Sequence, residues 1–350
     1  MNTGILYALL AAALFGASTP FAKLLIEHSH PVLLAGLLYL GSGIGLAILM
    51  AIRHLRTSAS TSNAYLTSKD LPWFAGAVLF GGVIGPALLM IGLLYTPGSS
   101  AALLLNLEGV FTALLAWFVF RENFDRRIFW GMVSIVFGSI LLSWDQAPEP
   151  GGAWGALAIV GACLCWGIDN NLTRKVSASD AMQIASIKGL VAGGFNIALA
   201  LMAGAALPAT ADALSATLVG FFGYGVSLVL FVLALRHLGT ARTGAYFSSA
   251  PFVGATLSLL ILQESPNVLF IAGFAAMALG LWLHLTEKHE HTHTHEPMTH
   301  THAHVHDEHH QHAHDFPWDG TEPHVHEHYH PAITHKHQHY PDIHHRHGHA

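Results

Sequence analysis

The chain has 350 residues; 52% of them are hydrophobic, 10% are Asp, Glu, Lys or Arg, and the formal net charge is −6. In ordinary soluble proteins these four charged types make up about a quarter of all residues, so this composition excludes an ordinary soluble globular fold. It indicates a protein that crosses a lipid bilayer several times.

Apolar runs that match the thickness of a bilayer recur along the chain with short interruptions. A helix needs about 20 residues to cross a hydrocarbon layer of ~30 Å. The first 26 residues lack a basic start, so we expect a retained span there rather than a cleaved signal. We predict membrane-spanning helices at 4–26, 32–52, 72–95, 100–120, 128–143, 153–173, 181–203, 214–236, 244–262 and 267–285.

The distribution of Lys and Arg predicts the orientation of these spans. If the N-terminus is cytoplasmic, thirteen of the fifteen basic residues fall in cytoplasmic segments. Lys23 alone falls near the outer face, and Lys188 falls inside a span. Cytoplasmic loops carry an excess of Lys and Arg. We therefore expect a multi-pass protein of the cell membrane (inner or plasma) with both termini in the cytoplasm.

An internal repeat divides the apolar part into two halves of five spans. The stretch FGASTPFAKLL (15–25) aligns with WGIDNNLTRKV (166–176) at an offset of 151. Because five is an odd number, the two halves must lie in opposite orientations. Inverted repeats are characteristic of alternating-access transporters, whose substrate site lies between the halves near the midplane. At an offset of 142, Glu122, Gly131 and Gly138 match Glu264, Gly273 and Gly280.

These features resemble the drug/metabolite transporter superfamily and, within it, the EamA-like members. The motifs are the first-span pattern FGASTPFAK (15–23), NLEGVFTALLAWFVFRE (106–122) and its counterpart SSAPFVGATLSLLILQE (248–264). Gly109 stands where such sequences often have proline, as Pro251 does in the second half. The superfamily carries amino acids, sugar conjugates, nucleotide precursors and drugs, so the resemblance does not select a substrate.

The resemblance covers about residues 3–286 and implies an all-α integral membrane protein. Its ten transmembrane helices would form two inverted five-helix EamA-type repeats, at 3–144 and 152–286. The remaining residues, 287–350, would form a disordered, His-rich cytoplasmic tail. The resemblance also implies a transporter that acts on a small-molecule solute.

A few polar residues lie inside the predicted spans, where a charged side chain costs ~2.5–3.5 kcal/mol on insertion scales. They are Glu108, Asp169 with the adjacent Asn170 and Asn171, and Lys188. Asp169 and Lys188 each lie ~10 Å along their helices from the short loop between the sixth and seventh spans. We therefore predict a partly buried ion pair, which either engages a charged or zwitterionic substrate or clamps two helices together.

Four positions inside or at the ends of the predicted spans are interpreted individually. Glu108 near the midplane is either a proton-coupling carboxylate or cation ligand, or a structural carboxylate hydrogen-bonded to helix ends. His237 ends the eighth span, where interfacial anchoring is expected. Glu122 and Glu264 directly follow spans and are expected to be solvated carboxylates at the membrane boundary.

No enzyme signature is present in residues 1–286. They contain neither an HExxH motif nor a P-loop, so we expect a protein that is not an enzyme, has no catalytic residues and requires no cofactor. Cys163 and Cys165 lie in one apolar run, GACLCWG, and are expected to be membrane-core residues.

The C-terminal segment 287–350 contains 23 of the 28 histidines and few aliphatic residues. It cannot bury enough apolar surface to fold alone. Neutral imidazole binds Zn²⁺, Ni²⁺, Co²⁺ and Cu²⁺, so we predict many weak, interchangeable metal sites; the alternative is a tail whose charge merely changes with pH. The candidate ligands are His289, His291, His293, His295, His300, His302, His304, His306, His309, His310, His312 and His314.

Two functional hypotheses follow. In the first, the body is a secondary-active transporter, exporting a small metabolite or drug-like compound, and the metal-binding tail regulates it. In the second, the body exports a divalent metal (Zn, Ni or Co) that the tail captures, or anchors the tail as a metal buffer. The expected partners are the lipid bilayer, a small-molecule substrate and transition-metal ions, with no nucleic acid; the sequence leaves open whether the carrier is a monomer or a homodimer.

Overall fold

The computed structural model describes most of the chain: residues 3–56, 68, 70–120, 126–146, 151–176 and 180–286, and four tail segments at 290–295, 298–304, 324–330 and 333–338. The chain forms two compact units. One unit is the helical body, Met1–Arg56 with Leu66–Thr286, and the other consists of Thr57–Tyr65 and Glu287–Ala350.

The first half of the body contains five transmembrane segments, as predicted. The third segment is interrupted by one turn of π-helix and the fourth by a turn at 105–106. The elements are α1 (Thr3–Ile26), α2 (Pro31–Arg56), α3 (Leu71–Ala77), the π-helix η1 (Val78–Ile84), α4 (Gly85–Tyr95), α5 (Gly98–Leu104), α6 (Leu107–Phe120) and α7 (Arg126–Gln146).

The second half repeats this order of elements. Across the described residues, eight helical segments are long and apolar enough to cross a membrane, and α12 and α13 are shorter apolar helices. The elements are α8 (Gly152–Val176), α9 (Ala181–Met202), α10 (Thr210–Gly220), the π-helix η2 (Phe221–Val226), α11 (Ser227–Phe247), α12 (Ala250–Ile261) and α13 (Val268–Leu285).

One predicted boundary is wrong. We expected a loop between residues 236 and 244, but α11 is helical through Phe247 and the chain turns at Ser248 and Ser249. The intervening sequence contains no proline, so its backbone can stay helical. Pro251 comes next, and the residues before a proline are those that leave the helical conformation most readily.

The two π-helices confirm the internal repeat. Residues 79–84 of η1 correspond, at an offset of 142, to residues 221–226 of η2. π-Helices are rare and usually occupy a single turn, so their occurrence at equivalent places in the third span of each half is a specific sign of common architecture.

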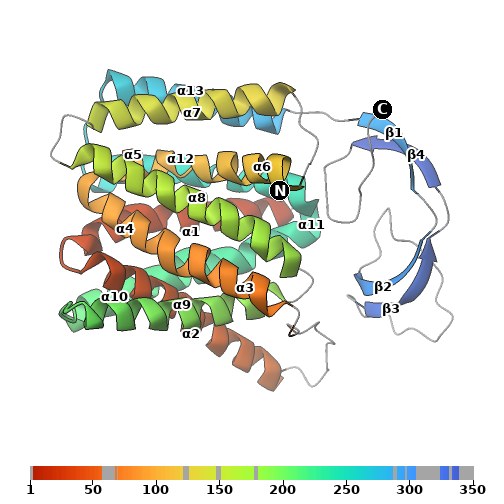
Figure 1. The fold of residues 1–350 in the computed structure, drawn as a ribbon, viewed down its shortest axis with the longest axis horizontal. Coiled ribbons are helices and arrows are strands. Elements are labelled where there is room, and N and C mark those ends of the chain that lie inside the picture. Colours follow the sequence, from red (N-terminus) through yellow and green to blue (C-terminus); the bar gives the residue numbers. More distant parts are fainter. Residues whose placement is uncertain are drawn as a thin grey trace. The chain divides into compact units, whose positions relative to one another are not determined.

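Helices of one half pack directly against helices of the other half, so the two halves are interleaved rather than separate. Helix α2 packs on α9, and α7 packs on α13 at one edge of the bundle (Figure 1). Helix α1 packs on α11 and α12 of the second half, and α8 packs on α4 and α6 of the first half. The opening helix of each half therefore lies against the third and fourth spans of the other half.

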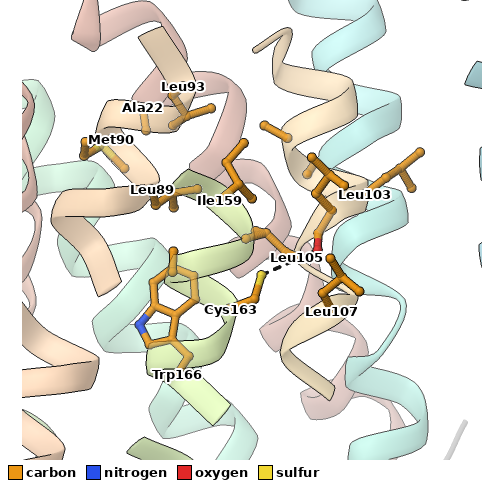
Figure 2. Packing of buried hydrophobic residues seen from close by; sticks show 14 of the residues in the cluster. Ala22, Leu89, Met90, Leu93, Leu103, Leu105, Leu107, Ile159, Cys163 and Trp166 are labelled. Atoms are coloured by element: carbon orange, nitrogen blue, oxygen red, sulfur yellow. Dashed lines mark hydrogen bonds between the residues drawn. The ribbon is translucent and has the colours of Figure 1, made fainter. Parts of the chain in front are cut away.

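Figure 2 shows part of the buried core, where α8 meets α4 and α5. Ile159 and Trp166 of α8 lie among Leu89 of α4 and Leu103 of α5, and all four are buried. Cys163 is a free, buried thiol whose Sγ donates to the carbonyl of Leu104 at 3.5 Å. The expectation that the cysteines are membrane-core residues agrees with this packing.

Helices α2 and α9 cross with their backbones in contact. A Cβ atom added to Gly189 would lie 2.7 Å from the backbone nitrogen of Gly43 and 2.8 Å from the carbonyl oxygen of Tyr39. One turn further along α9, a Cβ on Gly193 would lie 2.9 Å from the carbonyl oxygen of Gly36. Small residues allow this close approach in membranes, where helices associate by packing rather than by the hydrophobic effect.

This crossing predicts that alanine substitution affects stability differently at two glycines of α9. We expect Gly189→Ala to lower the free energy of unfolding by about 1–3 kcal/mol, since the added methyl group meets backbone atoms that cannot rotate away. Gly194→Ala is the control, because Gly194 is exposed and a Cβ there has no neighbour within 4 Å. Thermal unfolding in detergent measures both, and equal midpoints for the two variants would contradict the crossing.

A carboxylate links the two halves near the outer end predicted for the bundle. Glu264, after α12, accepts hydrogen bonds from the backbone N–H groups of Gly98 at 2.6 Å and Ser99 at 2.9 Å. Glu264 also attracts the charge of Lys23, whose Nζ donates to the carbonyl of Leu93. The prediction of a merely solvated Glu264 is therefore wrong, because the first turn of α5 presents N–H groups that need an acceptor.

We expect Glu264→Ala to lower the free energy of unfolding by about 2 kcal/mol, because it leaves two N–H groups of α5 without their charged acceptor. Glu264→Gln keeps one carbonyl acceptor and should lose less. Glu27→Gln is the control, an exposed acid that directly follows α1. Denaturation in detergent compares the three, and a Glu264→Ala midpoint as high as that of Glu27→Gln would contradict the linkage.

In the C-terminal tail, the described residues form four strands: β1 (Glu290–His295), β2 (Met298–His304), β3 (His324–His330) and β4 (Ile333–Gln338). β1 pairs with β4 and β2 with β3, both antiparallel. The H-x-H alternation has the two-residue period of a strand, and backbone pairing satisfies polar groups without an apolar core.

In this register, histidines stand opposite histidines. The facing positions are His291 with His337, His293 with His335, His300 with His328, His302 with His326, and His304 with His324. Among the predicted metal ligands, His295 faces Ile333. His289, His306, His309, His310, His312 and His314 lie outside the described residues.

Candidate functional site

The structure contains the ion pair expected between the sixth and seventh spans. Lys188 Nζ of α9 donates to Asp169 Oδ2 of α8, and their side chains are 16% and 9% exposed. Thr173 Oγ1, one turn further along α8, donates to Asp169 Oδ1 at 3.0 Å. Both oxygens of the carboxylate therefore have a donor, as a nearly buried charge requires.

Glu108 joins the same group from α6. Its Oε1 accepts from Asn170 Nδ2 at 2.9 Å, and this amide also lies 3.2 Å from Thr112 Oγ1. Glu108 interacts electrostatically with both Asp169 and Lys188. We call these four residues, Glu108, Asp169, Asn170 and Lys188, the charged cluster; it brings together one helix of the first half and two of the second.

The fifth candidate, Asn171, serves the packing of α8 on α6. Its side chain is buried, and Nδ2 donates to the carbonyl of Gly167 at 2.8 Å and to that of Thr112 at 3.3 Å. These bonds tie Asn171 to backbone atoms. It therefore holds the helix that carries Asp169 and Asn170 in place.

Three further side chains at this centre were missed from the sequence. Tyr39 Oη and Trp166 Nε1 both donate to the carbonyl of Gly81, at 2.7 and 3.0 Å. Asn196 Nδ2 donates to the carbonyl of Gly82 at 3.1 Å. These carbonyls belong to η1, and the bonds hold the π-turn against α2, α8 and α9. The only sequence signal was a Gly-Gly pair inside an apolar span.

Glycine at position 81 allows the ion pair to lie against η1. A Cβ added there would lie 2.7 Å from Cβ of Asp169 and closer still to its carboxyl group. The carboxyl group of Asp169 thus occupies the space beside the π-turn.

An aromatic group adjoins the charged cluster through Tyr39. The Tyr39 ring lies 5.6 Å from that of Tyr224 in η2, which lies 5.8 Å from Phe15. Phe15 in turn lies 5.5 Å from Phe247. We call Phe15, Tyr39, Tyr224 and Phe247 the aromatic group. Such tilted and edge-on pairs are the favoured geometries for aromatic rings.

The charged residues of this centre are not repeated at the equivalent positions of the other half. At the offsets of the two halves, Asp169 corresponds to Ser18 and Glu108 to Ala250. The packing is nevertheless equivalent: Gly223 lies against Ser18, with an added Cβ 2.7 Å from the serine Cβ, as Gly81 lies against Asp169. The chain thus uses one framework twice, and each acid of the centre occurs in one half without an acidic counterpart in the other.

His237 lies apart from these groups. It is exposed, and its ring lies 5.7 Å from that of Tyr7. Over the described part of the chain, no three His, Cys, Asp or Glu side chains come together as a set that could hold a metal ion.

The ion pair predicts a non-additive mutational cycle. We expect Lys188→Met alone to lower the free energy of unfolding by about 3–5 kcal/mol, because it leaves Asp169 buried without its counter-charge. The double variant with Asp169→Leu should recover most of the lost free energy of unfolding, since two apolar side chains need no counter-charge. Unfolding of the two single variants and the double variant measures the coupling; a double variant less stable than both single ones would contradict it.

Together, the helices and their polar centre define a class: a multi-pass membrane protein whose two inverted halves meet at buried charges. The model of the EamA-like transporter family matches residues 2–144 and, a second time, residues 153–286. The chain belongs to the EamA-like transporter family.

Several known proteins are similar to this chain over most of their length. An uncharacterized transporter of Methanothermobacter thermautotrophicus is 26% identical over 76% of this chain and 81% of its own. The uncharacterized transporter YetK of Bacillus subtilis is 23% identical over 78% and 84%, and the uncharacterized inner membrane transporter YedA of Escherichia coli is 22% identical over 71% and 80%. A solved crystal structure has a TM-score of 0.58 and 16% identity, covering 81% of this chain and 95% of that one, which shows a shared fold.

Proposed function

We propose that this EamA-like transporter is a secondary-active exporter of a small metabolite or drug-like compound that bears a charged or zwitterionic group. The observation that carries the proposal is the charged cluster, which lies where α6 of one half meets α8 and α9 of the other. In inverted-repeat transporters the substrate site lies between the halves near the midplane.

The chemistry of the cluster suits a substrate that exchanges partners with it. Lys188 offers a cation to a carboxylate or phosphate, and Asp169 and Glu108 offer anions to an ammonium group. A zwitterion that enters replaces the internal ion pair with two external pairs, so no charge is left alone in the bilayer. The adjoining aromatic group gives an apolar part of the same molecule a surface to pack on.

Glu108 is the proposed coupling residue. Its carboxylate accepts from the exposed Asn170, whereas the carboxylate of Asp169 is held by Lys188 and Thr173. A carboxylate with fewer fixed partners exchanges a proton or a cation more readily. Because the sequence has no P-loop, the driving force would be an ion gradient or the substrate's own gradient.

The tail is proposed to bind metal and regulate the carrier. Facing histidines such as His300 and His328 are of a type that coordinates Zn²⁺, Ni²⁺, Co²⁺ or Cu²⁺. The tail directly follows Thr286, whose carbonyl accepts from Arg127 Nη1 at 2.8 Å. Through this bond, a metal-dependent change in the tail would act on the contact between α7 and α13.

The second candidate function is divalent-metal export with the tail as the capture segment, or metal buffering on a membrane anchor. The facing histidines favour a role in metal handling. The residues that the structure describes, in the body and in the tail strands alike, bring no three potential ligands together. For this reason export of an organic solute ranks first.

Transport in vesicles tests the role of the ion pair. We expect Asp169→Leu with Lys188→Met to reduce flux of charged solutes by about 10–100-fold, the cost of losing one or two charge-assisted contacts. His237→Gln is the control, since His237 lies outside the cluster. If the double variant retains flux, the pair does not engage the substrate and only holds the two helices together.

A chain that stops after Thr286 tests the tail separately. We expect it to transport the organic solute at the same rate as the full chain without metal, and to lose the response to added Zn²⁺ or Ni²⁺. Flux is followed for metal and for a panel of charged metabolites. Identical metabolite flux in both chains at every metal concentration would contradict regulation, and metal flux in the full chain that is lost on truncation would favour the second function.

A further inference from the structure

Gly109 directly follows Glu108 of the charged cluster, in the first turn of α6. Glycine is less favourable than alanine in a helix, so a glycine there needs a reason. The two usual structural reasons are a positive φ and close packing against a neighbour. Neither holds for Gly109: the described glycines with positive φ are Gly151 and Gly204, and a Cβ added to Gly109 would have no neighbour within 4 Å.

The start of α6 does not require a glycine at this position either. At the offset of 142, Gly109 corresponds to Pro251 in the first turn of α12. Both helices begin directly after a turn in the fourth span of their half. The second half thus carries a ring where the first half carries no side chain. The space at Gly109 is therefore a property of the first half and not of the shared framework.

The surface around Gly109 is polar. Gly109 and Asn170 are exposed, and Glu108 and Thr112 are partly exposed. Asn170 Nδ2 donates to Glu108 Oε1 at 2.9 Å and lies 3.2 Å from Thr112 Oγ1. Exposed polar groups at this depth are unfavourable against hydrocarbon, so this side of α6 is suited to water or to a polar solute.

Gly194 of α9 shows the contrasting case. A Cβ added there would also have no neighbour within 4 Å. The side chains beside it, however, are apolar: Val191 is 51% exposed and Phe195 is 54% exposed. A surface of this kind is suited to lipid. The two glycines are thus equally open, and they differ in the polarity of their surroundings.

We infer that Gly109 keeps open a water-filled recess beside Glu108, and that the part of a solute next to its ammonium group enters this recess. The inference rests on the function proposed above, in which Glu108 offers an anion to an ammonium group. Gly109 is then a specificity residue. It admits solutes with a large substituent beside the ammonium group, and a larger residue at this position excludes them while smaller solutes still bind.

Thiol reactivity tests the recess without any substrate. Gly109→Cys and Gly194→Cys are compared in the full chain in lipid vesicles, with a charged methanethiosulfonate reagent on both sides of the membrane. We expect Gly109→Cys to react at least about tenfold faster, because the reactive thiolate forms in water and not in hydrocarbon. The wild type gives the background, since Cys163 and Cys165 are buried. Equal rates for the two variants would place Gly109 against lipid and overturn the inference.

Flux in the same vesicles tests specificity, with three zwitterionic probes of increasing size: free alanine, leucine and phenylalanine. We expect Gly109→Leu to lower phenylalanine flux by about tenfold, the effect of an overfilled contact, and to leave alanine flux close to that of the wild type. Gly109→Ser, which adds only a small polar side chain, should lie between the two. Gly194→Leu is the matched control and should leave the flux of all three probes unchanged.

The outcomes distinguish this inference from the function on which it rests. A loss of flux that grows with probe size in Gly109→Leu, and is absent in Gly194→Leu, supports it. Equal losses for the three probes, or no loss for any of them, overturn it while transport by the wild type upholds the proposed function. A wild type that carries none of the probes contradicts the proposed function for zwitterions, and the specificity role of Gly109 falls with it.

Discussion

Hydrocarbon offers no hydrogen-bond partner, so a polar group inside the body is costly to bury unless the protein itself supplies a partner. This requirement connects most of the contacts at the centre. The carbonyl of Gly81 in η1 receives donors from α2 and α8, that of Gly82 receives one from α9, and Asp169 of α8 is neutralised by Lys188 of α9. The side chains that face a substrate in the proposed mechanism are thus also those that hold the helices together. For this reason the matched double substitution is needed to separate binding from folding.

The two halves share their helices and their packing but not their charged residues. The helices, the π-turns and the glycine contacts recur in both halves, because the same backbone must pack in the same way twice. Asp169 and Glu108 have no acidic counterparts, since Ser18 and Ala250 stand in their places. The repeated framework therefore holds a polar centre that is not repeated. Asp169 lies on α8, and Glu108 contacts α8 through Asn170.

Apart from the boundary expected at 236–244, the spans were predicted within a few residues because the length of an apolar run determines where a chain can cross a bilayer. The Asp169–Lys188 pair was predicted because a short loop fixes the relative depth of two adjacent helices. The partners of Glu264 were not, since Gly98 and Ser99 lie more than 160 residues away in the chain. The roles of Tyr39 and Trp166 depend on a π-turn that composition does not mark.

The interleaved packing of the two halves has an evolutionary consequence. Helix α1 buries its face on α11 and α12, and α8 buries its face on α4 and α6, so neither five-helix half contains the surface that its own first helix needs. An ancestor with a single half could bury these faces only by pairing with a second copy inserted upside down in the same membrane. Such a gene product would have had to insert in both orientations, with a nearly even balance of basic residues on its two sides. A fused chain can hold opposite charge biases in its two halves, and each half can carry an acid, Glu108 or Asp169, that has no acidic counterpart in the other half.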